Sequence, residues 1–195
     1  MDYPLAPEHP FPADKLAVWE ACLYLQAHAE FYHCDVSRLA IGGQSAGGNI
    51  AAAICLMAIQ QQKSLFACQV LNDPPLDIHT PAQQKPCPPG CIPVEQSRFF
   101  DDCYRLESQS TDPLCSPIFA EDAQLAQLPP ALIISGENDS LCNEQEAYAM
   151  RLLHAGVEIT ARRFSGIAHG YPLDSSVGQR ALSMVTDFLH RHLLA

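Results

Sequence analysis

One stretch of the sequence constrains the fold more than any other, because it places a serine between two glycines. The pattern is Gly43-Gln44-Ser45-Ala46-Gly47, with the apolar residues Leu39-Ala40-Ile41 before it and a small, apolar run from Ala46 to about Gln60 after it. Glycine is expected at both flanking positions because a side chain there would collide with the strand or the helix. The pattern predicts a strand that turns sharply into a helix, with Ser45 in a strained conformation at the strand's C-terminal end.

The rest of the chain alternates between strand-like and helix-like segments. We expect strands over 38–42, 66–71, 131–135 and 157–164, the last of them an edge strand, and helices over 12–32, 46–62, 97–106, 144–155 and 178–194. This alternation predicts an α/β fold with a mostly parallel sheet and helices on both faces. Residues 1–195 are expected to form a single domain, in which the proline-rich region 78–127 is an irregular, lid-like insertion.

Three of the predicted helices suggest how they pack. Helical spacing predicts one buried face on the first helix, made of Leu16, Trp19, Leu23 and Ala27. The helix at 97–106 is expected to have an apolar side made of Phe99, Phe100, Cys103 and Tyr104. The helix that follows Ser45 is apolar on most sides, which predicts that it packs between neighbouring elements.

Charge and composition exclude several classes of partner. The chain has 22 acidic and 11 basic residues, so its surface should repel nucleic acid and anionic lipid. No apolar run approaches the roughly 18 residues of a membrane span, and the first residues do not read as a signal peptide. The expectation is a cytoplasmic protein that acts on a small molecule.

The cysteines point to neither a metal site nor a disulfide framework. There are nine of them, an odd number, and several lie in apolar runs where cysteine acts as a small hydrophobic residue. The pair in Cys87-Pro88-Pro89-Gly90-Cys91 lacks a second pair at zinc spacing, and its Pro-Pro-Gly predicts a loop. We therefore expect reduced thiols, no metal and no cofactor.

Three reactive residues follow predicted strands in the order serine, acid, histidine. A serine hydroxyl needs a base to become a nucleophile, and histidine serves best when a carboxylate holds its tautomer. Ser45, Asp139 and His169 supply these groups in the order Ser, acid, His, and parallel strands bring their C-terminal ends together. The residues alone leave other candidates for the acid, namely Glu137, Asp73 and Asp77.

Several motifs resemble those of the hormone-sensitive-lipase-like branch of the α/β-hydrolase esterases, close to bacterial acetyl esterases. The resemblance spans nearly the whole chain and includes Asp2-Tyr3-x-Leu5-Ala6-Pro7-Glu8, Gly43-x-Ser45-Ala46-Gly47-Gly48-Asn49, Asp112-Pro113-x-x-Ser116-Pro117, Leu128-Pro129-Pro130-Ala131, Asp139-x-Leu141 and His169-Gly170-Tyr171. It implies a serine carboxylesterase that cleaves short-chain acyl esters through an acyl-enzyme. It also favours Asp139 as the acid, and it implies that the Ala46 amide donates to the oxyanion.

The sequence departs from the family pattern in three places. Gln44 stands where the family has an elbow aspartate, and Pro4 stands where it has arginine. No H-G-G-G loop, whose amides supply most of the family's oxyanion hole, precedes Asp2. The resemblance therefore implies an N-terminally incomplete fold with reduced activity. Either the chain is a fragment, or a second copy or another partner covers the open edge of the strand before Ser45. The alternative is an inactive hydrolase scaffold that serves as a ligand-binding or interaction module.

Overall fold

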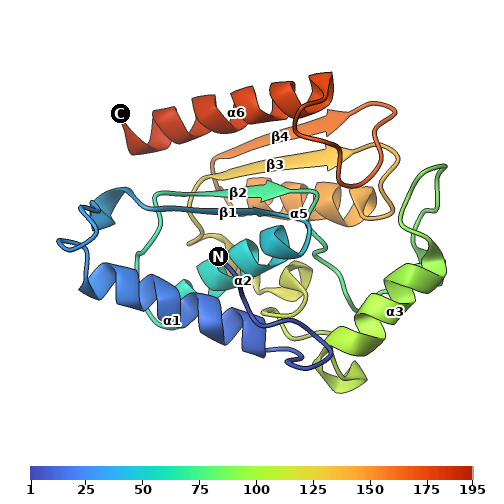
Figure 1. Cartoon of the computed structure of the whole chain (residues 1–195), viewed down its shortest axis with the longest axis horizontal. Helices are drawn as coiled ribbons and strands as arrows, with labels where there is room; N and C mark the ends of the chain where they lie inside the picture. The colour runs from blue at the N-terminus through green and yellow to red at the C-terminus, as the bar shows by residue number, and fades with distance from the viewer. Residues whose placement is uncertain (195) are drawn as a thin grey trace.

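A four-stranded parallel sheet forms the centre of the protein (Figure 1). The computed structural model describes residues 1–194. The strands are β1 (Ala40–Gln44), β2 (Cys68–Asn72), β3 (Ala131–Gly136) and β4 (Ile159–Phe164), and they lie side by side in the order of the chain. The predicted α/β class and parallel sheet are confirmed, although three of the four strands begin two residues later than expected.

Helices cover both faces of the sheet, as predicted. On one face α2 (Ala46–Gln60) and α5 (Cys142–His154) pack against Leu71 and Ile133, while α6 (Ser176–Leu193) packs on the other face against Val70 and Leu132 (Figure 1). Neighbouring strand residues point to opposite faces, so continuous apolar runs are needed to bury both sides. Every residue of β3 is buried, whereas β4 is partly exposed, as the edge position predicted for it requires.

Helix α2 is the most deeply packed helix of the structure. All of its residues from Gly48 to Ala58 are buried, between the sheet on one side and α1 (Ala13–Ala27) on the other. The prediction that this helix packs between its neighbours is therefore confirmed. Its position fixes the residue before its first turn, Ser45, at the C-terminal edge of the sheet.

Helix α1 packs differently from its prediction. It ends at Ala27 rather than near Tyr32, and Leu16 is half exposed. The face against α2 carries Val18, Trp19 and Cys22, together with the buried ion pair of Asp14 and Lys15. The predicted stripe was wrong at Leu16 and Ala27 because the burial of Lys15, paired with Asp14, rotates the packed face of the helix.

The region between β2 and β3 is irregular, with short helices. It contains two α-helices, α3 (Val94–Tyr104) and α4 (Asp122–Leu125). It also contains three short 3-10 helices, each of three residues, at Ala82–Gln84, Glu107–Gln109 and Pro117–Phe119. The predicted short helix is present in α3, but its apolar side is not packed, because Phe99 and Phe100 are exposed and no residue of this helix is buried. At the end of this helix the Tyr104 ring meets Phe11 edge to face. That the region acts as a lid stays a prediction.

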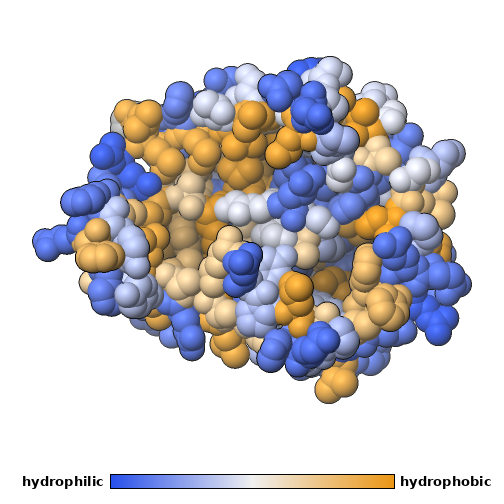
Figure 2. Space-filling model, viewed as in Figure 1, coloured by the Kyte–Doolittle hydropathy of each residue, from blue (hydrophilic) through white to orange (hydrophobic). Residues whose placement is uncertain are grey.

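The strand before Ser45 lies at one end of the sheet. β1 pairs with β2, and within residues 1–194 no strand pairs with its other side. Figure 2 shows apolar atoms gathered on this side, below α6, where β1 runs with Ala40 and Ile41 only partly buried. That a second copy or another chain covers this edge stays a prediction. No helix in the described part of the chain has the length and apolar character needed to cross a membrane.

Candidate active site

Ser45 occupies a strained turn at the junction of β1 and α2. Its φ of 52° lies in the left-handed region, which a residue with a side chain seldom adopts. The backbone N–H of Ser45 donates to the carbonyl of Asn72 at 2.8 Å, so the turn is tied to the end of β2. The strained conformation predicted from the flanking glycines is confirmed, and it leaves the Ser45 side chain partly buried at the edge of the sheet.

The two glycines around Ser45 play different parts. A Cβ on Gly43 would overlap the backbone of Gly47, so the turn requires glycine at position 43. A Cβ on Gly47 would meet nothing within 4 Å, so the predicted collision there was wrong. The main chain of residue 47 occupies the space that a side chain at position 43 would need, so the steric requirement for glycine lies at position 43.

The three residues expected to act together are hydrogen-bonded in a chain. Ser45 Oγ lies 2.8 Å from His169 Nε2, and His169 Nδ1 lies 2.8 Å from Asp139 Oδ2. An ionised carboxylate can only accept hydrogen bonds, so Nδ1 carries the ring proton and Nε2 is free to accept from the serine hydroxyl. This tautomer is the one that a base acting on Ser45 requires.

Each member of the chain follows a different strand. Ser45 follows β1, Asp139 lies in the turn between β3 and α5, and His169 lies in the loop after β4. The last two loops are joined by the backbone, because the N–H of Asn138 donates to the carbonyl of Ile167 at 2.8 Å. The order of the parallel strands therefore brings Ser45 into contact with His169, 124 residues later in the chain, and His169 into contact with Asp139, 30 residues earlier.

Asp139 is fully buried and held on both carboxylate oxygens. Oδ1 accepts from the backbone N–H of Leu141 at 3.0 Å, and Oδ2 accepts from His169 and, at 3.4 Å, from the amide of Gln145. Gln145 also donates to the carbonyl of Pro74 at 3.2 Å, so it joins α5 to the segment after β2. Gln145 was not predicted from the sequence, although it lies only six residues after Asp139, in the first turn of α5, because nothing in the sequence shows that its amide points back to that carboxylate.

The surroundings of His169 raise the pKa of its ring. Burial alone would lower its pKa, but the hydrogen bond and negative charge of Asp139, with the charge of Asp73, outweigh burial and raise the pKa above its ordinary value. A raised pKa means that the imidazolium is stabilised here, and this is the form that a general base passes through.

The rival acids do different work. Glu137 is exposed, and it accepts from the Ser165 hydroxyl at 2.6 Å and the Gly166 N–H at 2.7 Å, which braces the start of the His169 loop. Asp77 accepts from the Thr80 hydroxyl at 2.6 Å and so shapes its own turn. Asp73, in contrast, is buried beside the site without touching the His169 ring nitrogens.

The residues on either side of Ser45 face outward. Gln44 and Ala46 are both exposed, and Ala46 is the first residue of α2. Amides in the first turn of a helix have no partner inside the helix, and the helix dipole places partial positive charge there. The backbone N–H of Ala46 is therefore available next to the Ser45 hydroxyl; that it donates to an oxyanion stays a prediction.

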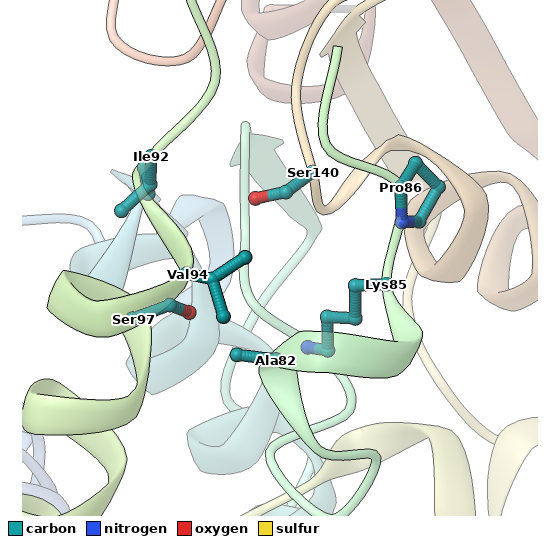
Figure 3. Close-up of a pocket in the computed structure, with 7 residues that line it drawn as sticks. All are labelled: Ala82, Lys85, Pro86, Ile92, Val94, Ser97 and Ser140. Carbon is teal, nitrogen blue, oxygen red and sulfur yellow. The ribbon is translucent and has the colours of Figure 1, made fainter.

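The segment 82–97 packs closely against the acid turn. Figure 3 shows the Ser140 hydroxyl pointing into a narrow hollow between Lys85, Ile92, Val94 and Ser97. That hydroxyl has no hydrogen-bond partner among the described residues. Below it, the Lys85 ammonium lies 2.6 Å from the buried carboxylate of Glu144 on α5. The irregular segment is thus anchored to the helix that begins beside Asp139.

The cysteines are free thiols. No disulfide joins them within residues 1–194, and the two sulfur atoms of Cys87 and Cys91 lie 3.1 Å apart in a loop whose Gly90 approaches Ala168. Among the described residues, no three His, Cys, Asp or Glu side chains gather as metal ligands would.

Comparison with known proteins gives consistent matches. The profile of a family described as alpha/beta hydrolase fold matches residues 1–173. An arylesterase from Saccharolobus solfataricus is 32% identical over 182 residues, which is 88% of this chain and 56% of the relative. An ethyl acetate hydrolase from Pseudomonas putida is 29% identical over 198 residues, 98% of this chain and 62% of the relative.

The solved structures agree with the sequence relatives. A hyperthermophilic esterase from Pyrobaculum calidifontis superposes with a TM-score of 0.90 at 31% identity, covering 100% of this chain and 66% of that one. The chain spans about half the length of the curated relatives that it matches with the strongest scores, between 51% and 56%.

Proposed function

Since the chain belongs to the hormone-sensitive-lipase-like branch of the alpha/beta hydrolase fold family, we propose that it is a serine carboxylesterase that cleaves short-chain acyl esters. The observation that carries this proposal is the hydrogen-bonded chain from Ser45 through His169 to Asp139, with both contacts at 2.8 Å. A buried carboxylate, an imidazole of fixed tautomer and a serine in a strained turn together form the arrangement needed for acyl transfer.

In the first half of the reaction, Ser45 Oγ attacks the ester carbonyl carbon while His169 Nε2 takes the hydroxyl proton. The imidazolium that forms is stabilised by Asp139, which stays ionised. It then gives its proton to the alcohol oxygen as the C–O bond breaks, so that the alcohol leaves and the acyl group stays on Ser45. In the second half, His169 removes a proton from water as the water oxygen attacks the acyl carbon, and it returns this proton to Ser45 Oγ as the acyl C–Oγ bond breaks and the carboxylic acid leaves.

Negative charge on the carbonyl oxygen needs a donor close to Ser45. We assign the backbone N–H of Ala46 to this role, because it opens α2 and is the amide immediately after the nucleophile. One such donor typically contributes about 10²- to 10³-fold in rate. Gly43 supports the same group by permitting the turn that aims it.

The short acyl group in this proposal rests on the relatives. The ethyl acetate hydrolase that matches 98% of this chain is named for an ester with a two-carbon acyl group. The segment 82–97 also packs against Ser140, the residue after Asp139, and so lies near this side of the site. We propose that this segment, within the lid-like region 78–127, borders the acyl group.

Hydrolysis of p-nitrophenyl acetate and labelling by a fluorophosphonate test the proposal. The wild type is expected to hydrolyse the ester and to take up one probe at Ser45. Ser45→Ala should lose both, whereas Ser108→Ala, a change at an exposed serine, should keep both. Equal rates for the wild type and Ser45→Ala, or a folded wild type that no probe labels, would overturn it.

A further inference from the structure

Asp73 is a buried carboxylate that the mechanism above does not use. It follows β2 and is 0% exposed, and its Oδ1 has no hydrogen-bond partner in the described part of the chain. An ionised oxygen buried in this way costs free energy unless a nearby positive charge or dipole compensates it. A carboxylate at this position therefore calls for a group that benefits from its charge.

The backbone at Asp73 is strained and firmly held. Its φ of 47° lies in the left-handed region, and such conformations gather at functional sites. The Asp73 N–H donates to the Ile134 carbonyl at 2.9 Å, and Tyr171 donates its hydroxyl proton to Asn72 Oδ1 at 2.7 Å. Since Ser45 N–H also donates to Asn72, the carboxylate is held between the nucleophile turn and the His169 loop.

The group that benefits lies in the His169 loop. Gly170 directly follows His169 in the chain. Its backbone N–H donates to Asp73 Oδ2 at 3.4 Å. The negative charge of Asp73 also raises the pKa of His169, after the larger effects of burial, which lowers it, and of Asp139. Burial and the charge of Asp139 in turn raise the pKa of Asp73 to about 6, against the influence of His169 and of the Gly170 and Gly136 amides.

Two other titratable groups face this cluster. Burial, and then the charge of Asp73, raises the pKa of the Tyr171 hydroxyl to about 12. The pKa of Cys91, in the loop beside Ala168, is raised mainly by its contact with Cys87 and more weakly by Asp139. Both groups are therefore uncharged near neutral pH. The charges that act on His169 come from Asp139 and Asp73.

We propose that Asp73 is a positioning residue for His169, which holds the His169 loop through the Gly170 amide and stabilises the imidazolium as a second negative charge. The inference rests on the proposed function, because the imidazolium matters only if His169 acts as the base. Asp139 fixes the ring by a direct hydrogen bond, while Asp73 acts through the loop backbone and through its charge.

The decisive experiment is an NMR titration of the His169 ring, which needs no substrate. A His169→Gln sample identifies the His169 signals among those of the eight histidines. In Asp73→Asn, whose amide oxygen still accepts from Gly170, the pKa of His169 is expected to fall below its wild-type value. Asp77→Asn, a loss of charge four residues further along, should leave it unchanged. An unchanged pKa in Asp73→Asn overturns the proposal.

A second variant separates charge from folding. Asp73→Gly removes the carboxylate, and glycine adopts a positive φ without strain. This variant therefore tests the loss of the negative charge without adding backbone strain. It should lower the pKa of His169 in the same direction as Asp73→Asn. If both variants keep the wild-type melting temperature and the wild-type pKa, Asp73 does not act on His169.

Kinetics link this result to the reaction. For Asp73→Asn, the acidic limb of the kcat/KM profile should move to lower pH together with the NMR pKa, while KM stays near its wild-type value. The double variant Asp73→Asn/Asp139→Asn should be slower than Asp139→Asn by about tenfold or more. Equal rates for these two overturn the proposal. A wild type without esterase activity overturns the proposed function instead, and the titration still decides whether Asp73 acts on His169.

Discussion

Gly43 lies directly against the backbone of Gly47, so that a Cβ on Gly43 would overlap the carbonyl group of Gly47. The residue between them, Ser45, takes a φ of 52° to let β1 turn back into α2. This contact is possible only because the residue at 43 has no side chain. The nucleophile turn thus depends on one glycine more than on the other.

Gly43→Ala is expected to destabilise the protein by about 1–3 kcal/mol, the usual cost of overpacking a tight site. Gly47→Ala is the matched control, since its Cβ would meet nothing within 4 Å. In a helix the change from glycine to alanine gains up to about 1 kcal/mol. Urea denaturation measures both, and equal losses of unfolding free energy would contradict this account of the turn.

Asp139→Asn is expected to lower kcat for p-nitrophenyl acetate by about 10³- to 10⁴-fold, because the ring of His169 would be held in the wrong tautomer. Glu137→Gln tests the neighbouring acid. The glutamine oxygen can still accept from Ser165 and Gly166, so this variant should keep a rate within several-fold of wild type. A larger loss in Glu137→Gln than in Asp139→Asn would reverse the assignment of the acid.

Lys15→Ala is expected to destabilise the protein by about 3–5 kcal/mol, the range for removing one partner of a buried ion pair. Lys15 is 0% exposed, and its ammonium contacts the Asp14 carboxylate and the Asn49 side chain. Its loss leaves Asp14 as a buried charge without a cation, held by the Tyr104 hydroxyl and the backbone N–H of residue 15. Lys63→Ala, at an exposed lysine, should change the melting temperature little. Similar melting shifts for the two variants would refute the prediction.

Glu144 should make stability depend on pH in a defined window. Burial raises the pKa of the Glu144 carboxyl. The charge of Lys85 and the hydrogen bonds from the Asp77 and Leu76 amides lower it, but burial outweighs them and the pKa rises from 4.5 to about 7. The folded state thus binds this proton more tightly than the unfolded chain does. The stabilisation from Glu144 is fully present below pH 4.5 and is lost as pH rises through about 7.

The measurement compares wild type with Glu144→Gln, whose amide does not titrate. The unfolding free energy of wild type minus that of Glu144→Gln should fall by up to about 3 kcal/mol between pH 4.5 and pH 7, and level off above that range. Denaturant titrations at half-unit pH steps give the curve. A difference that stays constant or rises with pH would show that the Glu144 proton is not bound more tightly in the folded state.

Much of the architecture could be predicted because it depends on local patterns. Strand and helix periodicity revealed the parallel sheet, and the apolar surroundings of α2 were visible in its composition. The faces of α1 and α3 could not be predicted in the same way. Lys15 is buried because Asp14 and Asn49 meet it, and Phe99 is exposed because no element covers that side of α3. The first fact depends on Asn49, 34 residues away in the chain, and the second depends on how whole elements are arranged in space.

The sequence by itself determined the nucleophile turn and the order of Ser45, Asp139 and His169, because glycine spacing and strand order act over short stretches. Only the tertiary structure decided which carboxylates surround the base. Asp139, Glu137 and Asp73 all follow strands, yet one bonds the ring, one braces the loop and one is buried beside it. These differences of a few ångströms arise from the register of β2, β3 and β4, which long-range packing sets.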